Sequence, residues 1–390
     1  MTSRHSQNST DESMRSLPRH ANLAIEYIEA TNLDEFPDDV VLRRSLTTRS
    51  VISTTSSFAA QYHRAVTRPK LQCIQEIGQG LQGTIFEQVG QSLVMKKEKP
   101  GNDALPSNLV HEYTMHRSVA AAFSRYAPSV GCDIHIPKPS GITQQSDDAF
   151  WTENLHKFPA GHQTRTTLVH MERILPLPKV IRRALVKQFY PFQNHVVDLD
   201  MTNTILHAPE NKHCLARTYL GCNDRPLRKD TFSLRNFPLY LDAMVRLDLE
   251  TRTLALAMGQ SYAIMHWGAC VDADDVEFVL GSSAKPSREQ QPDFQNRAVA
   301  FFLLDFGQCT AVDLAQDTAM VYQAFKGAMV TGDNQLFIPH YKKSPQLFAA
   351  FRKGYVEAGT RILEDKNLCD KFSMEHFMVE YEEYAEDFLL

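Results

Sequence analysis

The sequence lacks the features that mark membrane and secreted proteins. None of the apolar runs in its 390 residues approaches the ~18–20 residues that a membrane helix needs, and the strongest, Ala298–Leu304, is only long enough for a strand. The N-terminal residues MTSRHSQNSTDESMRS are polar and contain no apolar core, so we expect no secretory signal. We therefore expect a cytoplasmic protein.

Cysteine is present but follows no recognisable pattern. The seven cysteines are scattered and contain no C-x-x-C motif, which favours reduced thiols over a disulfide scaffold. Four histidines and cysteines lie close together in the middle of the chain: His207, His213, Cys214 and Cys222. Their spacing matches no standard zinc-ligand pattern, so we predict ordinary buried or surface side chains there and no metal site.

The sequence also lacks a large excess of positive charge. Its 41 Lys and Arg and 46 Asp and Glu give a formal net charge of −5, which does not support nucleic-acid binding over the whole surface. One predicted helix, which we call the basic helix, places four cations on one side: Lys179, Arg182, Arg183 and Lys187. This pattern indicates either a local face for nucleic acid or an ordinary solvated helix face.

Composition divides the chain into three parts. Residues 1–69 are largely rich in Ser, Thr and Arg, and we expect a mostly disordered tail and tether. Residues 70–175 are rich in strand-like runs, whereas residues 176–390 are mainly helical in pattern. Within the last part, the polar, proline-containing stretch 281–297 predicts a flexible loop. A strand-rich front and a helix-rich back predict an α+β fold in two lobes.

A glycine motif lies at the start of the strand-rich part. Gly78, Gly80 and Gly83 form G-x-G-x-x-G between two strand-like runs. A dinucleotide-binding motif lies between a strand and a helix, so this placement is instead typical of the hairpin that covers phosphates in protein kinases. Taken alone, an ordinary glycine-rich hairpin explains the motif equally well.

Further kinase-like features follow in the expected order along the chain. Lys96 lies on the next predicted strand, and Glu112 lies on the following predicted helix, where it can pair with Lys96. Asp272 and Glu277 are spaced like the base and the metal ligand of a kinase catalytic loop, and Asp305 begins a D-F-G triplet. Together these features predict a protein-kinase-like fold with a small β-rich N-lobe and a larger helical C-lobe.

The acidic segment departs from the kinase pattern. Glu277 takes the place of the usual Asn, and no A-P-E segment follows Asp305. Four carboxylates lie within six residues with no Lys or Arg among them: Asp272, Asp274, Asp275 and Glu277. Such carboxylates repel a γ-phosphate unless metal ions intervene, whereas they bind an amine or a guanidinium well. The structural alternative is a solvated acidic turn that caps a strand.

The segment MHWGACVDADDVEFVLG, with FFLLDFGQC and LVHMERILPLP, resembles a family of fungal proteins labelled as a domain of unknown function, which includes the arginine-containing cyclodipeptide synthases. The resemblance covers about Leu71 to the C-terminus. The paired Asp and following Glu of that family correspond here to Asp274, Asp275 and Glu277. The resemblance implies an enzyme of secondary metabolism that condenses arginyl-tRNA with a second aminoacyl-tRNA into a cyclo-arginine-Xaa diketopiperazine, without a required cofactor.

This resemblance suggests roles for the candidate residues. Asp274, Asp275 and Glu277 would hold the arginine guanidinium or take a proton from the attacking amine, with Asp272 in support. The basic helix would contact tRNA phosphates. The glycine motif and Lys96 would then be relics of a kinase site or would bind the RNA backbone.

Two alternatives stay open. The first is an ATP- and Mg²⁺-dependent kinase for a small cationic metabolite, which needs Lys96 and uses Glu277 and Asp305 as metal ligands. The second is a pseudokinase that binds ligands without turnover. Because fold does not determine function, the choice depends on the acidic segment and on the family resemblance.

Overall fold

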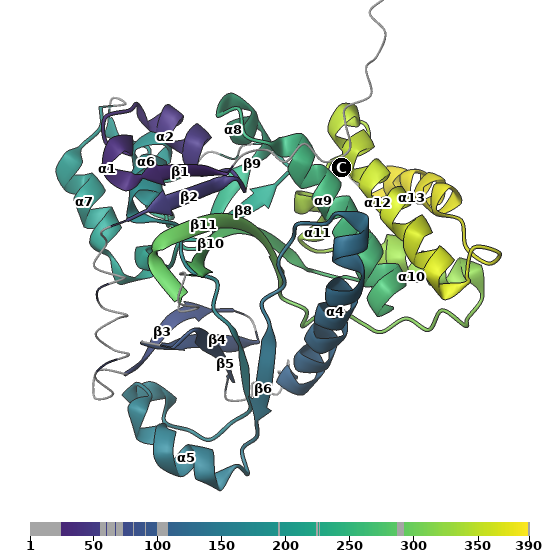
Figure 1. The fold of residues 1–390 in the computed structure, drawn as a ribbon, viewed down its shortest axis with the longest axis horizontal. Helices are drawn as coiled ribbons and strands as arrows, with labels where there is room; N and C mark the ends of the chain where they lie inside the picture. The colour runs from purple at the N-terminus through teal and green to yellow at the C-terminus, as the bar shows by residue number, and fades with distance from the viewer. Residues whose placement is uncertain are drawn as a thin grey trace, which may run out of the picture.

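The computed structural model describes residues 25–54, 60, 67, 73–80, 82–89, 91–99, 108–193, 196–223, 225, 227–286 and 292–388. Helices and two separate β-sheets make up this part of the chain, so the predicted α+β class is confirmed (Figure 1). None of the helices in this part is long and apolar enough to cross a membrane.

The smaller sheet has five antiparallel strands in the order β3-β4-β5-β7-β6. Its strands are β3 (Ile74–Gln79), β4 (Gly83–Gln88), β5 (Leu93–Glu98), β6 (Pro139–Thr143) and β7 (Leu168–Glu172). Helix α4 (Leu109–Val130) lies beside this sheet, and the Asn108 side chain caps its first turn by accepting a hydrogen bond from the His111 amide (Figure 1).

The other face of the smaller sheet is covered by the segment between β6 and β7. This segment contains α5 (Asp148–Asn154) and the short 3-10 turns η2 (Leu155–Lys157) and η3 (Ala160–His162). Trp151 and Phe158 from this segment pack with Phe86 of β4 in a small apolar core. Successive side chains of a strand point to opposite faces of the sheet. In β5, Lys96 therefore faces α4, and Lys97 faces the α5 segment.

The larger sheet has six strands in the order β1-β2-β11-β10-β8-β9. Its strands are β1 (Glu26–Glu29), β2 (Ser50–Ser53), β8 (Ala216–Tyr219), β9 (Phe237–Tyr240), β10 (Glu277–Pro286) and β11 (Pro292–Leu304). The β1/β2 and β8/β9 pairs are parallel, and the long β10/β11 pair is an antiparallel hairpin that curls through the centre of Figure 1. Residues 176–390, which we predicted to be mainly helical, therefore contribute four of these strands.

The prediction of a flexible loop over 281–297 is wrong for its described residues, which continue strands β10 and β11. The polar side chains of these strands find backbone partners on a neighbouring segment. The Ser282 hydroxyl donates to the Pro176 carbonyl at 2.8 Å, and the buried Arg297 guanidinium donates to the same oxygen at 3.1 Å. Because buried polar groups with partners do not oppose folding, a polar sequence can here form a central hairpin.

The prediction of disorder over 1–69 is also wrong for residues 25–54. They form β1, α1 (Ala30–Leu33), α2 (Asp38–Ser45) and β2, and β2 pairs with β11. Val41, Leu42 and Ile52 are buried in the main core, which explains why a largely polar segment folds here. Apart from residues 60 and 67, the rest of 1–69 lies outside the described residues.

Helices account for most of the remaining chain. They are α6 (Lys179–Phe189), α7 (Leu199–His207), α8 (Leu241–Arg246), α9 (Thr251–Ala263), α10 (Thr318–Met329), α11 (Asn334–Phe337), α12 (Pro345–Lys366) and α13 (Met374–Phe388). Helices α9 and α12 approach so closely that a Cβ atom on Gly354 would lie 2.2 Å from the Leu256 carbonyl oxygen. This contact requires glycine and anchors α9, which leads into the acidic segment.

Candidate functional site

Lys96 and Glu112 form a buried ion pair between β5 and α4. The Lys96 Nζ lies 2.7 Å from both carboxylate oxygens of Glu112, as the sequence suggested, and the two side chains are 8% and 5% exposed. Burial by itself lowers the pKa of Lys96, but the charges of Asp305 and Glu112 outweigh burial and raise it. The Lys96 ammonium is therefore kept charged.

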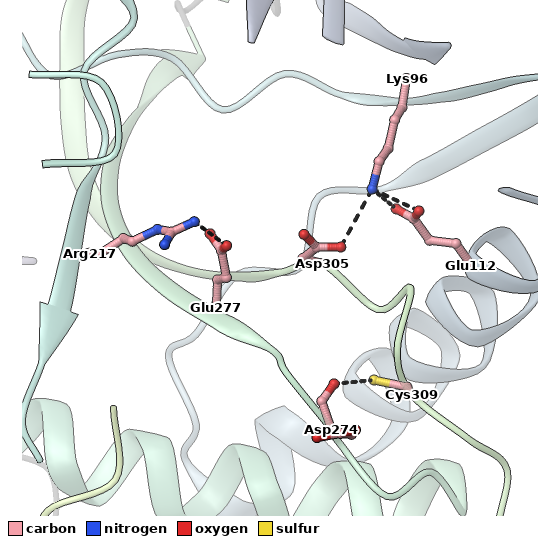
Figure 2. A network of polar contacts seen from close by, with 7 residues as sticks. All are labelled: Lys96, Glu112, Arg217, Asp274, Glu277, Asp305 and Cys309. Atoms are coloured by element: carbon pink, nitrogen blue, oxygen red, sulfur yellow. Dashed lines mark hydrogen bonds and ion pairs between the residues drawn. The ribbon is translucent and has the colours of Figure 1, made fainter. Parts of the chain in front are cut away.

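Asp305 extends this pair towards solvent. Its Oδ1 lies 3.5 Å from the Lys96 Nζ, and its side chain is 41% exposed. The Asp305 backbone has a φ of +65°, a conformation that is strained for a residue with a side chain. Figure 2 shows the Asp305 carboxylate directed toward the Lys96 ammonium.

The glycine motif forms the predicted hairpin of β3 and β4. The Gly80 amide donates to the Gly83 carbonyl at 2.9 Å across the turn, and Gly78 lies at an irregularity in the strand register. Gln82 in this turn reaches the D-F-G triplet, because a Cβ atom on Gly307 would lie 2.3 Å from the Gln82 Oε1. The structure therefore brings the glycine turn, Lys96 and Asp305 together.

Glu277 is paired with an arginine that the sequence analysis did not anticipate. It begins β10, and its carboxylate accepts a hydrogen bond from the Arg217 guanidinium on the adjacent strand β8. Arg217 also lies 3.5 Å from Asp333, which follows α10. The prediction of carboxylates without a nearby cation is therefore wrong at Glu277, because Arg217 comes from 60 residues earlier in the chain.

The pKa of Glu277 is shifted into the neutral range. Burial raises it to about 7, the charges of Asp305, Asp333 and Asp275 add to the rise, and Arg217 opposes it. The Glu277 side chain is 15% exposed. A carboxylate with this pKa can exchange a proton at neutral pH.

The other three acidic residues lie in the turn before β10. The Asp272 carboxylate accepts from the amides of Asp274 and Thr310, at 3.2 and 2.8 Å, so it braces the turn. The Thr331 hydroxyl donates to Asp274 at 2.9 Å, and the Asp333 amide donates to Asp275 at 3.1 Å. Burial raises the pKa values of both Asp272 and Asp275.

Backbone strain is concentrated in the same turn. Cys270, Ala273 and Asp275 have φ values of +59°, +60° and +55°. Such strain persists only where surrounding contacts impose it, and it is typical of functional sites. One of these contacts comes from His266, whose ring lies 3.1 Å from the Asp272 carbonyl oxygen and stacks on Phe325.

Neither a protein-family model nor a curated protein matches this sequence. The chemistry of the site therefore follows from its own residues. Figure 2 shows Asp305 between the Lys96–Glu112 pair and the Arg217–Glu277 pair. The buried Lys96 and the half-buried Arg217 thus flank a group of partly exposed carboxylates, which can bind a cationic ligand and accept its proton.

The basic helix is α6, and three of its four cations have partners within the molecule. The Arg182 guanidinium donates to two backbone carbonyls, at 3.1 and 3.0 Å. Arg183 pairs with Asp34, and the Lys187 Nζ lies 3.6 Å from Asp38. The four cations therefore do not form one free basic face, because Asp34 and Asp38 of the folded N-terminal segment pair with two of them and Arg182 bonds to backbone.

The histidines and cysteines near position 210 form no metal site in the structure. Cys214 is fully buried, and the His207 Nδ1 lies 2.7 Å from the Asn203 carbonyl oxygen of its own helix. Among all the residues that the structure describes, no group of three or more His, Cys, Asp or Glu could hold a metal ion.

Proposed function

We propose that the protein is an aminoacyl-tRNA-dependent cyclodipeptide synthase that forms a cyclo-arginine-Xaa diketopiperazine on a two-lobed, kinase-like scaffold. The observation that carries this proposal is the position of Glu277, which pairs with Arg217 among several carboxylates, where burial raises its pKa to about 7. Such a group combines a proton acceptor with a binding site for a guanidinium.

The kinase-like scaffold is supported by the smaller sheet and its neighbours. The glycine turn joins β3 and β4, a lysine on β5 meets a glutamate on α4, and a D-F-G triplet lies below the turn. Protein kinases use this combination of parts to bind a nucleotide. Because Glu277 here is paired with Arg217, we infer that the scaffold serves another reaction.

Glu277 is suited to act as the general base. An arginyl α-ammonium must lose one proton before its nitrogen can attack, and Glu277 with a pKa of about 7 can accept that proton at neutral pH. The amine then forms a C–N bond to the ester carbonyl of the second aminoacyl-tRNA. The ester C–O bond breaks, one of the two protons left on the nitrogen passes to the departing ribose oxygen, and the other stays as the N–H of the new amide.

Ring closure repeats the same chemistry. The free amine of the dipeptide attacks the remaining ester, which releases the second tRNA and one diketopiperazine. ATP is not required at this stage because both esters are already activated. The protein's contribution is to position the two esters and to remove the protons.

The arginine side chain would bind to the exposed carboxylates. Asp305 and Asp333 have side chains that are 41% and 42% exposed, and the charges of both act on Glu277. Carboxylates bind a guanidinium by forked, charge-assisted hydrogen bonds. Since three cations of α6 are paired, we assign tRNA contact instead to the exposed cations Arg225 and Lys229, which lie near Arg228 and its partner Asp230 in the sequence.

The test is to incubate the full-length protein with arginyl-tRNA and a mixture of other aminoacyl-tRNAs, and to detect cyclic dipeptides by mass spectrometry. We expect a cyclo-arginine-Xaa product from the wild type and its loss in Glu277→Gln, which keeps the shape of the side chain. Glu382→Gln is the matched control, because Glu382 pairs with Arg352 on the distant helices α12 and α13. Product formation that survives Glu277→Gln contradicts the proposal.

An ATP-dependent kinase for a small cationic metabolite is the second candidate. The contact of Lys96 with both Glu112 and Asp305 favours it, since kinases use this lysine on the nucleotide phosphates. The oxygen atoms of Glu277 and Asp305 are donors that suit Mg²⁺, but Arg217 and Lys96 occupy them and would have to move aside. ATP consumption with an amine library, without cyclic dipeptide, would favour the kinase.

A further inference from the structure

Lys97 is a second buried lysine on β5, and it faces away from the acidic site. Because successive residues of a strand point to opposite faces, Lys96 reaches α4 and Lys97 reaches the α5 segment. Lys97 is only 2% exposed. The side chains around Lys97 therefore determine how much free energy is needed to keep its ammonium charged.

The partners of Lys97 are neutral. Its Nζ donates to the hydroxyls of Thr164 and Thr166, at 3.1 and 2.8 Å, and lies 5.9 Å from the centre of a Trp151 ring. Among the described residues, no carboxylate forms an ion pair with it. Burial lowers the pKa of Lys97 to about 8, although the nearby charge of Glu98 opposes that shift.

The hydrogen-bonding capacity around Lys97 is only partly used. An ammonium has three donors, and two of them go to the threonine hydroxyls. The Thr166 hydroxyl donates in turn to the Glu98 carbonyl at 3.4 Å. Thr164 accepts from Lys97 and keeps its own hydrogen, so one ammonium donor and one hydroxyl donor remain for a ligand.

A cavity of about 300 Å³ lies at this place. Its lining includes Lys97, Lys99, Thr84, Thr164 and His162, together with one carboxylate, Glu98. The Glu98 carboxylate accepts a hydrogen bond from the Thr167 amide at 3.4 Å. The lining thus holds two lysines against one glutamate and is rich in hydroxyl donors.

We propose that this cavity, the Lys97 pocket, binds the phosphate group of a small phosphorylated metabolite at a site separate from the acidic site. A bound phosphate would be the anionic partner of the Lys97 ammonium. Its oxygens would accept hydrogen bonds from Lys97, Lys99 and the Thr164 hydroxyl. An ammonium surrounded by hydroxyls suits a tetrahedral phosphate, whereas a planar carboxylate is matched better by the fork of an arginine. The pocket lies on the other face of the sheet, so this inference does not depend on the proposed function.

The experiment measures thermal unfolding of the full-length protein in increasing inorganic phosphate, with chloride at equal ionic strength as the reference. A ligand that binds the folded state raises the melting temperature in a saturable way. We expect this rise in the wild type and its absence in Lys97→Met. In Thr164→Val, which keeps the side-chain shape, we expect phosphate affinity to fall about tenfold.

Lys157→Met is the matched control. Lys157 belongs to the same covering segment, where it bonds to Asn154 and lies 3.5 Å from Glu153, and it does not line the pocket. We expect this variant to respond to phosphate like the wild type. The proposal is overturned if the wild type shows no saturable response, or if Lys97→Met or Thr164→Val responds with wild-type affinity. A stabilising effect of polynucleotides without one of inorganic phosphate would also overturn it.

Discussion

The two faces of the smaller sheet give two adjacent lysines, Lys96 and Lys97, different side-chain partners. On the α4 face, Lys96 is held by two carboxylates, and its charge is part of an electrostatic network that reaches Glu277. On the α5 face, Lys97 is equally buried but meets two hydroxyls and an aromatic ring. The comparison shows that burial alone does not determine the state of a lysine, because the neighbouring charges decide it.

The difference extends to what each face can bind. The α4 face gathers negative charge from Asp275, Glu277, Asp305 and Asp333 around two compensated cations, so it favours a cationic ligand. On the α5 face, Lys97 forms no ion pair among the described residues, and the cavity has two lysines against one glutamate, so it favours an anion. Two sites of opposite charge therefore lie back to back across one sheet.

The largest expected effect is on the pH dependence at the α4 face. If Glu277 is the base, product formation at pH 5 should be about 100-fold below its plateau, because a group with a pKa of about 7 is then almost fully protonated. The measurement is the initial rate of diketopiperazine formation between pH 5 and 9, with substrates saturating. A rate that is flat between pH 5 and 7 would remove Glu277 from this role.

Removing the partner of Lys96 should have an effect of similar size, in this case on the stability of the protein. Glu112→Gln leaves a buried ammonium with only the more distant Asp305, and we expect the free energy of unfolding to fall by about 3 kcal/mol. Urea denaturation at pH 7 measures this change. Glu357→Gln on α12, whose carboxylate lies 3.9 Å from Lys353 at the surface, is the control and should change stability by less than about 1 kcal/mol.

Urea denaturation of a variant on the α5 face should show no loss of stability, in contrast to Glu112→Gln. Lys97→Met removes a buried charge that has no carboxylate partner among the described residues, so we expect stability in phosphate-free buffer to stay unchanged or to rise by about 1 kcal/mol. A loss like that of Glu112→Gln would show that the hydroxyls alone stabilise the ammonium, and the contrast between the faces would disappear.

The pH dependence sharpens this test. The lowered pKa of Lys97 means that the unfolded chain binds more protons than the folded one above about pH 8. The wild type should therefore gain stability relative to Lys97→Met as the pH rises from about 8 to 10. Paired urea titrations of the two proteins over this range measure the change, and a constant difference would contradict the lowered pKa.

The smallest expected effect on stability comes from removing the Thr166 hydroxyl. Thr166→Val removes the shorter of the two bonds to Lys97, and we expect a loss of about 1 kcal/mol in the free energy of unfolding. When Thr166→Val is made in the Lys97→Met variant, the loss in free energy of unfolding should be much smaller, because the hydrogen bond is already absent there. Urea denaturation of the four proteins gives the coupling directly, and equal costs in both backgrounds would show that the bond contributes nothing.

Part of the site was predictable because its signals are local. The glycine turn and Asp305 lie beside strand ends, Glu112 lies in the first turn of α4, and Lys96 lies within the short strand β5. Local patterning locates such short elements and their ends well. The sequence also placed the four acidic residues in one segment, but it did not give their partners in the fold. These residues are adjacent in sequence, yet Asp272 braces the turn while Glu277 meets Arg217.

The N-terminal segment and the hairpin strands were missed for a related reason. Both are polar in composition, and composition predicts loops for such sequences. Ser282 and Arg297 donate to the Pro176 carbonyl, and Arg183 pairs with Asp34, which is 149 residues away. No local pattern contains such partners.

By itself, the sequence determined which chemical groups are available and roughly which element carries each of them. The α+β class, the glycine hairpin and the Lys96–Glu112 pair follow from residue types at short, regular spacings. Only the tertiary structure decided that Arg217 compensates Glu277, that three cations of α6 have partners and that Lys97 faces a cavity without a carboxylate partner among the described residues. The reason is physical: the charge state of a buried group depends on what folding brings against it, and those neighbours come from distant parts of the chain.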